Sequence, residues 1–107
     1  MKAGLLVALI VGLSLVAEPV AGQAIQGRAV QENTGNPIEG AVVTAIGADG
    51  EVVTGSLTDE RGMFRLQVGR AGIYLLRLER IGYRSIDSGP HEVSGTGTTL
   101  VELVASE

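Results

Sequence analysis

The residues that could do chemistry gather in one short segment, Thr58-Asp59-Glu60-Arg61-Gly62, between two apolar runs. Two carboxylates and a guanidinium could in principle form an acid–base site. Adjacent residues of an extended backbone point to opposite sides, so the carboxylates of Asp59 and Glu60 should diverge. Asp59 can instead accept hydrogen bonds from the backbone amides that follow it, and Gly62 can supply a positive φ. We therefore interpret the segment as a turn.

The single histidine offers no better start for catalysis. His91 stands beside Glu92 in SGPHEVSG, whereas a hydrolytic zinc site commonly needs several ligands at helix or strand spacing. We interpret it as a lone surface histidine in a loop. A serine nucleophile needs a base and an orienting group, and the sequence places neither beside Ser56, Ser85, Ser88, Ser94 or Ser106. We predict no catalytic residue, no metal ligand, no cofactor and hence no enzyme.

An acidic pair further along the chain could contact calcium. It belongs to Asp49-Gly50-Glu51, and a tight calcium site uses about six or more oxygen ligands. The Asp-Gly pair favours a tight hairpin turn. We interpret these residues as the tip of a hairpin.

Composition narrows the classes of partner. The chain has 107 residues, which suggests one domain, and a formal net charge of −4. This acidity argues against nucleic acid, which binds basic faces. Cysteine is absent, so there is no disulfide framework. The aromatic residues Phe64, Tyr74 and Tyr83 are few for a platform that stacks on sugar rings or bases.

The first 24 residues have the pattern of a signal peptide. Met1-Lys2 precedes the apolar stretch AGLLVALIVGLSLVA, and small residues follow it. The stretch is shorter than the roughly 20 apolar residues that span a bilayer. We expect export to the periplasm or the medium and no membrane attachment after cleavage. Cleavage could follow Ala21, Gly22 or Ala24.

The rest of the chain, residues 25–107, alternates apolar and polar residues in short runs separated by turn residues. This period of two is typical of strands. We expect Gly55 to be a weak point or a bulge, and the strand signal fades after Gly82-Tyr83. The expected strands are 24–31, 41–46, 52–58, 63–68, 73–81 and 94–104.

These strands predict an all-β fold. Parallel pairs need long crossovers, and no helix separates the strands, so antiparallel pairing is expected. Two sheets must face each other to bury their apolar sides. We predict a small antiparallel Greek-key β-sandwich of six to seven strands after the signal-peptide helix; a barrel is the alternative. Phe64 should lie near the centre of the core.

Three segments in order, TGNPIEGAVV (34–43), TDERGMF (58–64) and YLLRLERIGY (74–83), resemble the carboxypeptidase regulatory-like domain family. The resemblance covers about residues 25–103, and Gly27-Arg28-Ala29 departs from the Gly-x-Val of the family at its third position. The matching positions are Thr34, Gly35, Pro37, Ile38, Gly40, Ala41, Val43, Thr58, Asp59, Gly62, Phe64, Tyr74, Leu76, Gly82 and Tyr83.

The resemblance implies a transthyretin-like (prealbumin-like) sandwich and a non-catalytic accessory module, as found at the N-terminus of TonB-dependent receptors. The implied partner is a protein of the cell envelope or a neighbouring domain. An alternative is a carbohydrate-binding module with a starch-binding-like fold, which would bind polysaccharide. A third hypothesis is a transthyretin-like hydrolase, since Tyr83-Arg84-Ser85 is similar to the terminal Tyr-Arg-Gly-Ser of hydroxyisourate hydrolases. It lacks the glycine, the terminal position and the histidine and arginine partners.

Overall fold

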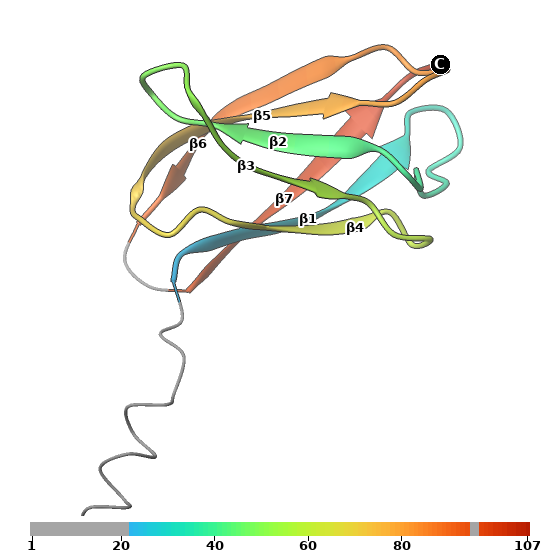
Figure 1. Ribbon diagram of the computed structural model, residues 1–107. Helices are drawn as coiled ribbons and strands as arrows, with labels where there is room; N and C mark the ends of the chain where they lie inside the picture. The colour runs from blue at the N-terminus through green and yellow to red at the C-terminus, as the bar shows by residue number, and fades with distance from the viewer. Residues whose placement is uncertain (1–21, 95–96) are drawn as a thin grey trace, which may run out of the picture.

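Two β-sheets face each other in this protein. The structure is a computed structural model that describes residues 22–94 and 97–107. Sheet A has the strand order β4-β1-β7 and sheet B the order β3-β2-β5-β6, which confirms the expected sandwich (Figure 1). The strands are β1 (Ala24–Gln31), β2 (Val42–Ile46), β3 (Val52–Leu57), β4 (Met63–Gln67), β5 (Gly72–Glu79), β6 (Ile86–Val93) and β7 (Thr98–Ala105).

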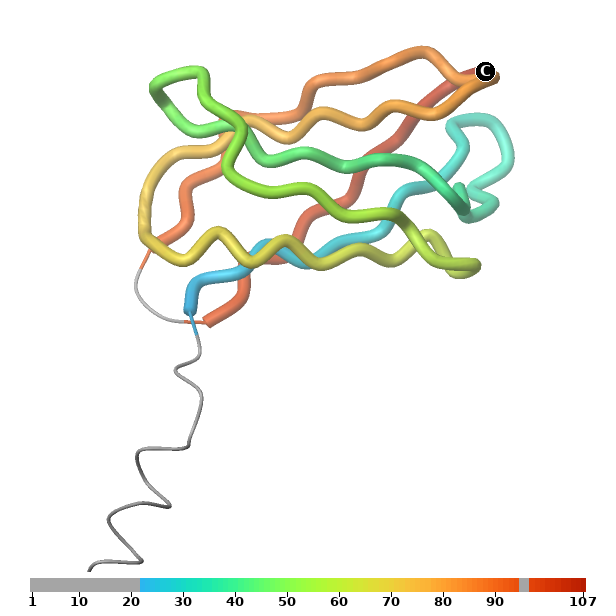
Figure 2. The backbone as a smooth tube through the Cα atoms, viewed as in Figure 1, coloured from blue at the N-terminus to red at the C-terminus, as the bar shows by residue number. Residues whose placement is uncertain are grey.

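One pairing contradicts the expectation of antiparallel strands throughout. β1 and β7 run parallel, from the pair Ala24↔Thr98 to the pair Gln31↔Ala105. Figure 2 shows these first and last strands side by side, in blue and red. The expectation assumed that a parallel pair needs a dedicated crossover. Here β2 to β6 themselves form the connection.

The sequence did not indicate β6 as a strand. Its segment contains Gly89 and Pro90, joined by a cis peptide bond, and its register against β5 shifts between Tyr74 and Leu76. Proline cannot donate to a ladder and is tolerated on edge strands and at bulges. β6 is an edge strand of sheet B. Gly89 and Pro90, which weakened the strand pattern in the sequence, are therefore compatible with this strand.

Of the two expectations for Gly55, a weak point or a bulge, the bulge is wrong. Gly55 pairs with Thr44 in regular register, and the shift in this ladder lies between Ala45 and Ile46 of β2. The pair Asp49-Gly50 forms the predicted hairpin turn: the Gly50 amide donates to the Gly47 carbonyl over 2.9 Å, and Gly50 has a φ of 84°.

The core lies between the sheets and follows the predicted alternation. In β4, Phe64 and Leu66 point inward while Arg65 and Gln67 are exposed. β2 and β5 show the same period, because successive side chains of a strand point to opposite faces. The buried cluster consists of Ile25, Ala29, Ile38, Ala41, Val43, Ala45, Phe64, Leu66, Val68, Tyr74, Leu76, Leu78, Val93, Leu103 and Ala105.

A glycine makes room for the single phenylalanine. Gly27 in the middle of sheet A pairs directly with Phe64 on one side and with Val101 on the other. A Cβ at Gly27 would lie 2.7 Å from the Phe64 Cζ and 2.8 Å from the Val101 Cγ2, too close for any side chain. The Phe64 ring therefore occupies the space that Gly27 leaves, and Phe64 is only 4% exposed.

No helix in the described residues is long and apolar enough to cross a membrane. The signal peptide expected over residues 1–24 lies mostly outside the described residues. The described chain begins at Gly22, and Ala24 is already the first residue of β1.

We expect Phe64→Ala to lower the free energy of unfolding by about 3–5 kcal/mol, because it empties the centre of a small core. Urea denaturation followed by circular dichroism measures the change. Val52→Ala is the control, since Val52 is 67% exposed. An equal midpoint for the two variants would show that Phe64 is not central.

Candidate functional site

The segment of charged residues at 58–62 is a corner that joins β3 to β4, as the sequence predicted. The Asp59 Oδ1 accepts hydrogen bonds from the amides of Arg61 and Met63, each over 2.9 Å. Gly62 has a φ of 77°, a conformation that favours glycine. The Asp59 carboxylate therefore holds its own backbone and is not paired with Glu60.

Thr58 forms hydrogen bonds that hold this corner against the residues just before β2. It is 4% exposed, and its Oγ1 accepts a 2.9 Å hydrogen bond from the Ala41 amide. Its own amide donates to the Ala41 carbonyl, and its carbonyl accepts from the Gly40 amide. Gly40 has a φ of 76°, and a Cβ there would meet only the Arg80 Nε at 3.8 Å. Gly40 is thus needed for its backbone conformation.

The two tyrosines have structural tasks. The Tyr74 hydroxyl donates a 2.7 Å hydrogen bond to the Arg70 carbonyl, and the residue is 4% exposed. Tyr83 packs against the core, and the Arg80 guanidinium lies 5.7 Å from its ring centroid. Phe64 and Tyr74 are buried, and the partly buried Tyr83 ring lies between the core and Arg80. None of them offers a free platform for a sugar.

The histidine is neither alone nor in a loop. His91 lies in β6, and its Nε2 is 2.9 Å from the Ser88 Oγ across the Gly89–Pro90 bulge. The sequence gave no signal for this pair, because only the irregular strand brings the residues together. In the described residues no carboxylate bonds to His91, so a relay with an orienting acid is not formed. The contact spans the bulge.

In the described residues no hydrogen bond joins the remaining serines or the Tyr83-Arg84-Ser85 segment to His91. The Arg84 amide donates to the Ser106 carbonyl, which ties this loop to the end of β7. Within residues 22–94 and 97–107 no group of three or more acidic, histidine or cysteine side chains could hold a metal ion. The residues that the sequence singled out are thus dispersed over the sandwich.

The outer face of sheet B differs between its halves. On the half formed by β3 and β2, Leu57 and Val42 are direct cross-strand neighbours and are 65% and 42% exposed. On the half formed by β5 and β6, Arg77 and Asp87 form an exposed ion pair with an Nε–Oδ1 distance of 2.8 Å. The hydrogen bond from Arg77 lowers the pKa of Asp87, and the same bond raises the pKa of Arg77. On the β5–β6 half the charged groups of Arg77 and Asp87 pair with each other, while on the β2–β3 half the apolar side chains of Val42 and Leu57 are exposed to solvent.

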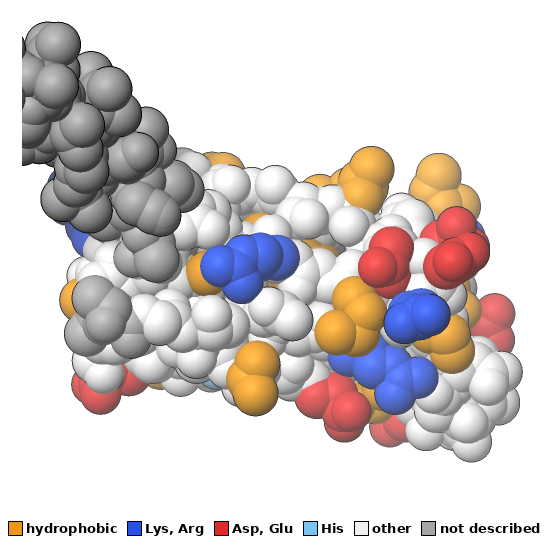
Figure 3. All heavy atoms as spheres, turned by 90° about the horizontal axis from the view of Figure 1, so that it is seen from below, with side chains coloured by type: hydrophobic (Ala, Val, Ile, Leu, Met, Phe, Trp, Pro, Cys, Tyr) orange, Lys and Arg blue, Asp and Glu red, His pale blue; other side chains and the backbone are white. Residues whose placement is uncertain are grey.

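Charged side chains gather at one end of the molecule, with both signs interspersed, when it is viewed from the side of β1 and β4 (Figure 3). One group is mainly acidic. Glu39, Asp59, Glu60 and Arg61 line an open hollow of about 500 Å³ beside the end of β3.

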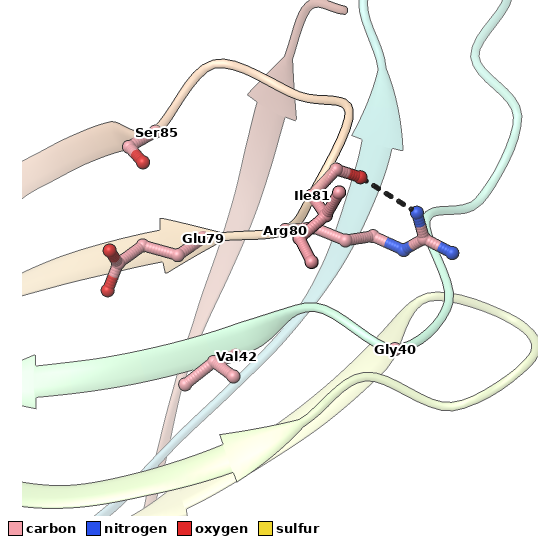
Figure 4. A pocket seen from close by; sticks show the side chains of 6 residues that line it. All are labelled: Gly40, Val42, Glu79, Arg80, Ile81 and Ser85. Carbon is pink, nitrogen blue, oxygen red and sulfur yellow. Dashed lines mark hydrogen bonds between the residues drawn. The ribbon is translucent and has the colours of Figure 1, made fainter.

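A second hollow of about 620 Å³, which we call the Val42 hollow, opens at this end of sheet B. Figure 4 shows the Arg80 side chain extending away from Glu79, with a hydrogen bond to the Ile81 carbonyl of 3.2 Å. Arg80 also donates to the Glu39 carbonyl, so its guanidinium is committed to backbone. The lining residues are Gly40, Val42, Glu79, Arg80, Ile81 and Ser85. With Ile81 95% exposed, the hollow combines an apolar surface with a polar rim.

When the sequence is compared with known protein families, one family matches. The sequence pattern of the carboxypeptidase regulatory-like domain matches residues 24–105. No curated protein matches the sequence.

Several solved structures share the fold. A "putative carbohydrate binding protein" from Bacteroides uniformis has 15% identity and a TM-score of 0.63 over 80% of this chain and 42% of its own. The 5-hydroxyisourate hydrolase of Klebsiella pneumoniae has 19% identity and a TM-score of 0.57, over 78% and 90%. BcpA, the major pilin subunit of Bacillus cereus, has 21% identity and a TM-score of 0.57, over 78% and 28%. This chain thus spans less than half of the first and third proteins, and at these identities the likeness concerns the fold alone.

We expect Thr58→Val to lower the free energy of unfolding by about 1–3 kcal/mol, because the buried Ala41 amide loses its acceptor. Urea denaturation again measures the change. Thr54→Val is the matched control: Thr54 is half-buried in β3, and its hydroxyl has no hydrogen-bond partner in the described structure. Equal losses in both variants would contradict the role of Thr58.

Proposed function

The chain belongs to the carboxypeptidase regulatory-like domain family, and on this premise we propose that it is an exported, non-catalytic interaction module. Its task is to dock a protein partner of the cell envelope. The docking surface is the apolar half of the outer face of sheet B, together with the Val42 hollow.

One observation carries this proposal. Eight large hydrophobic side chains are exposed in the described residues, and five of them lie in strands of sheet B. Contiguous exposed apolar patches on soluble proteins mark interaction sites. Ile81 extends the patch beyond β5, whereas only β7 carries exposed large hydrophobics in sheet A. Four of the five lie on the β2–β3 half, and one, Ile73, lies at the start of β5; the four are Val42, Val52, Val53 and Leu57.

The use of the polar residues supports a role without catalysis. Backbone groups are the hydrogen-bond partners of the side chains of Thr58, Asp59 and Tyr74. Every buried side-chain nitrogen or oxygen in the described residues has a partner. A catalytic group needs a position from which it reaches a substrate, and these groups are already engaged.

The main alternative is carbohydrate binding, which the description of the Bacteroides uniformis protein as a "putative carbohydrate binding protein" raises. Sugar-binding faces usually present aromatic rings, and the rings of Phe64, Tyr74 and Tyr83 are committed within the fold. We therefore favour a protein partner, and the experiment below includes polysaccharide as an outcome.

We expect the exported protein to capture a defined envelope protein, and Leu57→Glu to abolish the capture by placing a charge on the docking face. Affinity purification from envelope extract with quantitative mass spectrometry measures it. Leu100→Glu is the matched control, because Leu100 is 76% exposed on the other sheet. Micromolar binding to soluble polysaccharide without a captured protein, or capture that ignores Leu57→Glu, would refute the proposal.

Export has its own test at the N-terminus. The Gln23 carbonyl accepts hydrogen bonds from the amides of Val68 and Gly69, over 3.0 and 3.1 Å, and Ala24 is fully buried. Cleavage after Ala24 would remove these contacts, so we expect cleavage after Ala21 or Gly22. Intact mass of the protein from periplasm or medium measures the terminus. A mature chain that begins at Ile25, or an unprocessed chain in the cytoplasm, would contradict this expectation.

A further inference from the structure

Resting on the function proposed above, we propose how the partner binds: it adds an extended strand along the free edge of β3. The added strand carries a large apolar side chain opposite Gly55 and basic residues at both ends. The inference rests on the edge of β3, on a glycine that the fold does not need, and on the charges at both ends of the strand.

β3 has an open edge. It pairs with β2 alone, and β4 beside it belongs to the other sheet. The Thr58 amide donates to the Ala41 carbonyl over 2.9 Å, which makes Val42 and Leu57 a non-hydrogen-bonded pair of the antiparallel ladder. The amide and carbonyl of Leu57 therefore point away from β2, and by alternation those of Gly55 do too. These groups can pair with an added strand.

Nothing within the fold requires glycine at position 55. Its φ is outside the positive range of the glycines that need it, and a Cβ there would meet nothing closer than the Val43 carbonyl at 3.5 Å. Glycine in the interior of a strand weakens the strand, and it often marks a site that a ligand or another backbone approaches closely. On the same face, Val53 and Leu57 are 43% and 65% exposed and flank the gap.

The molecule already uses such a gap elsewhere. Gly27 stands directly opposite Phe64 in the β1–β4 ladder, and the Phe64 ring fills the space that the glycine leaves. An aromatic ring packed over a glycine on a neighbouring strand is a known stabilising pair in sheets. By the same geometry, Gly55 would receive a large apolar side chain from a strand added to β3.

The charges at the ends of β3 favour a strand from another protein over a strand from a second copy of this chain. Asp49 and Glu51 precede β3, and Asp59 and Glu60 follow it. A second β3 paired antiparallel about Gly55 would set Glu51 opposite Asp59 of the copy at both ends. Like charges directly opposite each other destabilise a ladder. A strand with basic ends meets opposite charges instead.

The test uses a labelled nine-residue peptide, Lys-Thr-Val-Thr-Phe-Thr-Val-Thr-Lys, capped at both ends, whose symmetric sequence fits either strand direction. Fluorescence anisotropy with the exported protein should show saturable binding below about 1 mM. Peptides with Glu at both ends, or with Ala in place of Phe, should bind roughly tenfold more weakly or worse.

Gly55→Val fills the gap and should weaken binding of the basic peptide by roughly tenfold or more, while circular dichroism and the urea midpoint show an intact fold. Gly72→Ala is the matched control on β5, where a Cβ would meet only the Tyr74 ring, at 3.6 Å or more. Its binding should be unchanged.

Several results would overturn the inference: no saturable binding, equal binding of the acidic peptide, binding that ignores Gly55→Val, or a dimer in sedimentation that Gly55→Val dissolves. If envelope capture still depends on Leu57, the proposed function survives and only the edge is wrong. If capture also fails, both proposals are wrong.

Discussion

The packing of Phe64 over Gly27 is the constraint on which the rest of the sandwich depends. The core is aliphatic apart from the buried rings of Phe64 and Tyr74, and Gly27 in the central strand of sheet A leaves the space that the Phe64 ring occupies. This packing fixes the register of β1 against β4, because a shift by one residue would move the ring to the other face. It also fixes the position of β7, since Val101 closes the other side of the same glycine.

Local features of the fold could be predicted from the sequence. Alternation placed Phe64 and Leu66 inside and Arg65 outside, and the turn chemistry of Asp59 and Gly62 is as expected, because each depends on a few neighbouring residues. Non-local features could not. The parallel pairing of β1 with β7 joins the two ends of the domain, and no short pattern encodes it.

The candidate site divides in the same way. The sequence showed that Asp59 and Thr58 belong to a corner, but it did not show that Ser88 meets His91, because an irregular edge strand brings them together. Nor could it show the exposed patch. Val42 and Leu57 read as ordinary strand residues, and only the pairing of β2 with β3 puts them side by side on an uncovered face.

The parallel terminal strands also determine how the domain carries load. β1 starts beside the start of β7, and Gln31 lies beside Ala105 at the far end, where the Gln31 Nε2 donates to Glu107. The start of β1 and the end of β7 thus lie at opposite ends of the sandwich (Figure 1). Tension between the termini would slide β1 past β7 and strain their whole ladder together, instead of peeling its hydrogen bonds apart singly. A pull on the two ends of the sandwich would therefore load this ladder in shear.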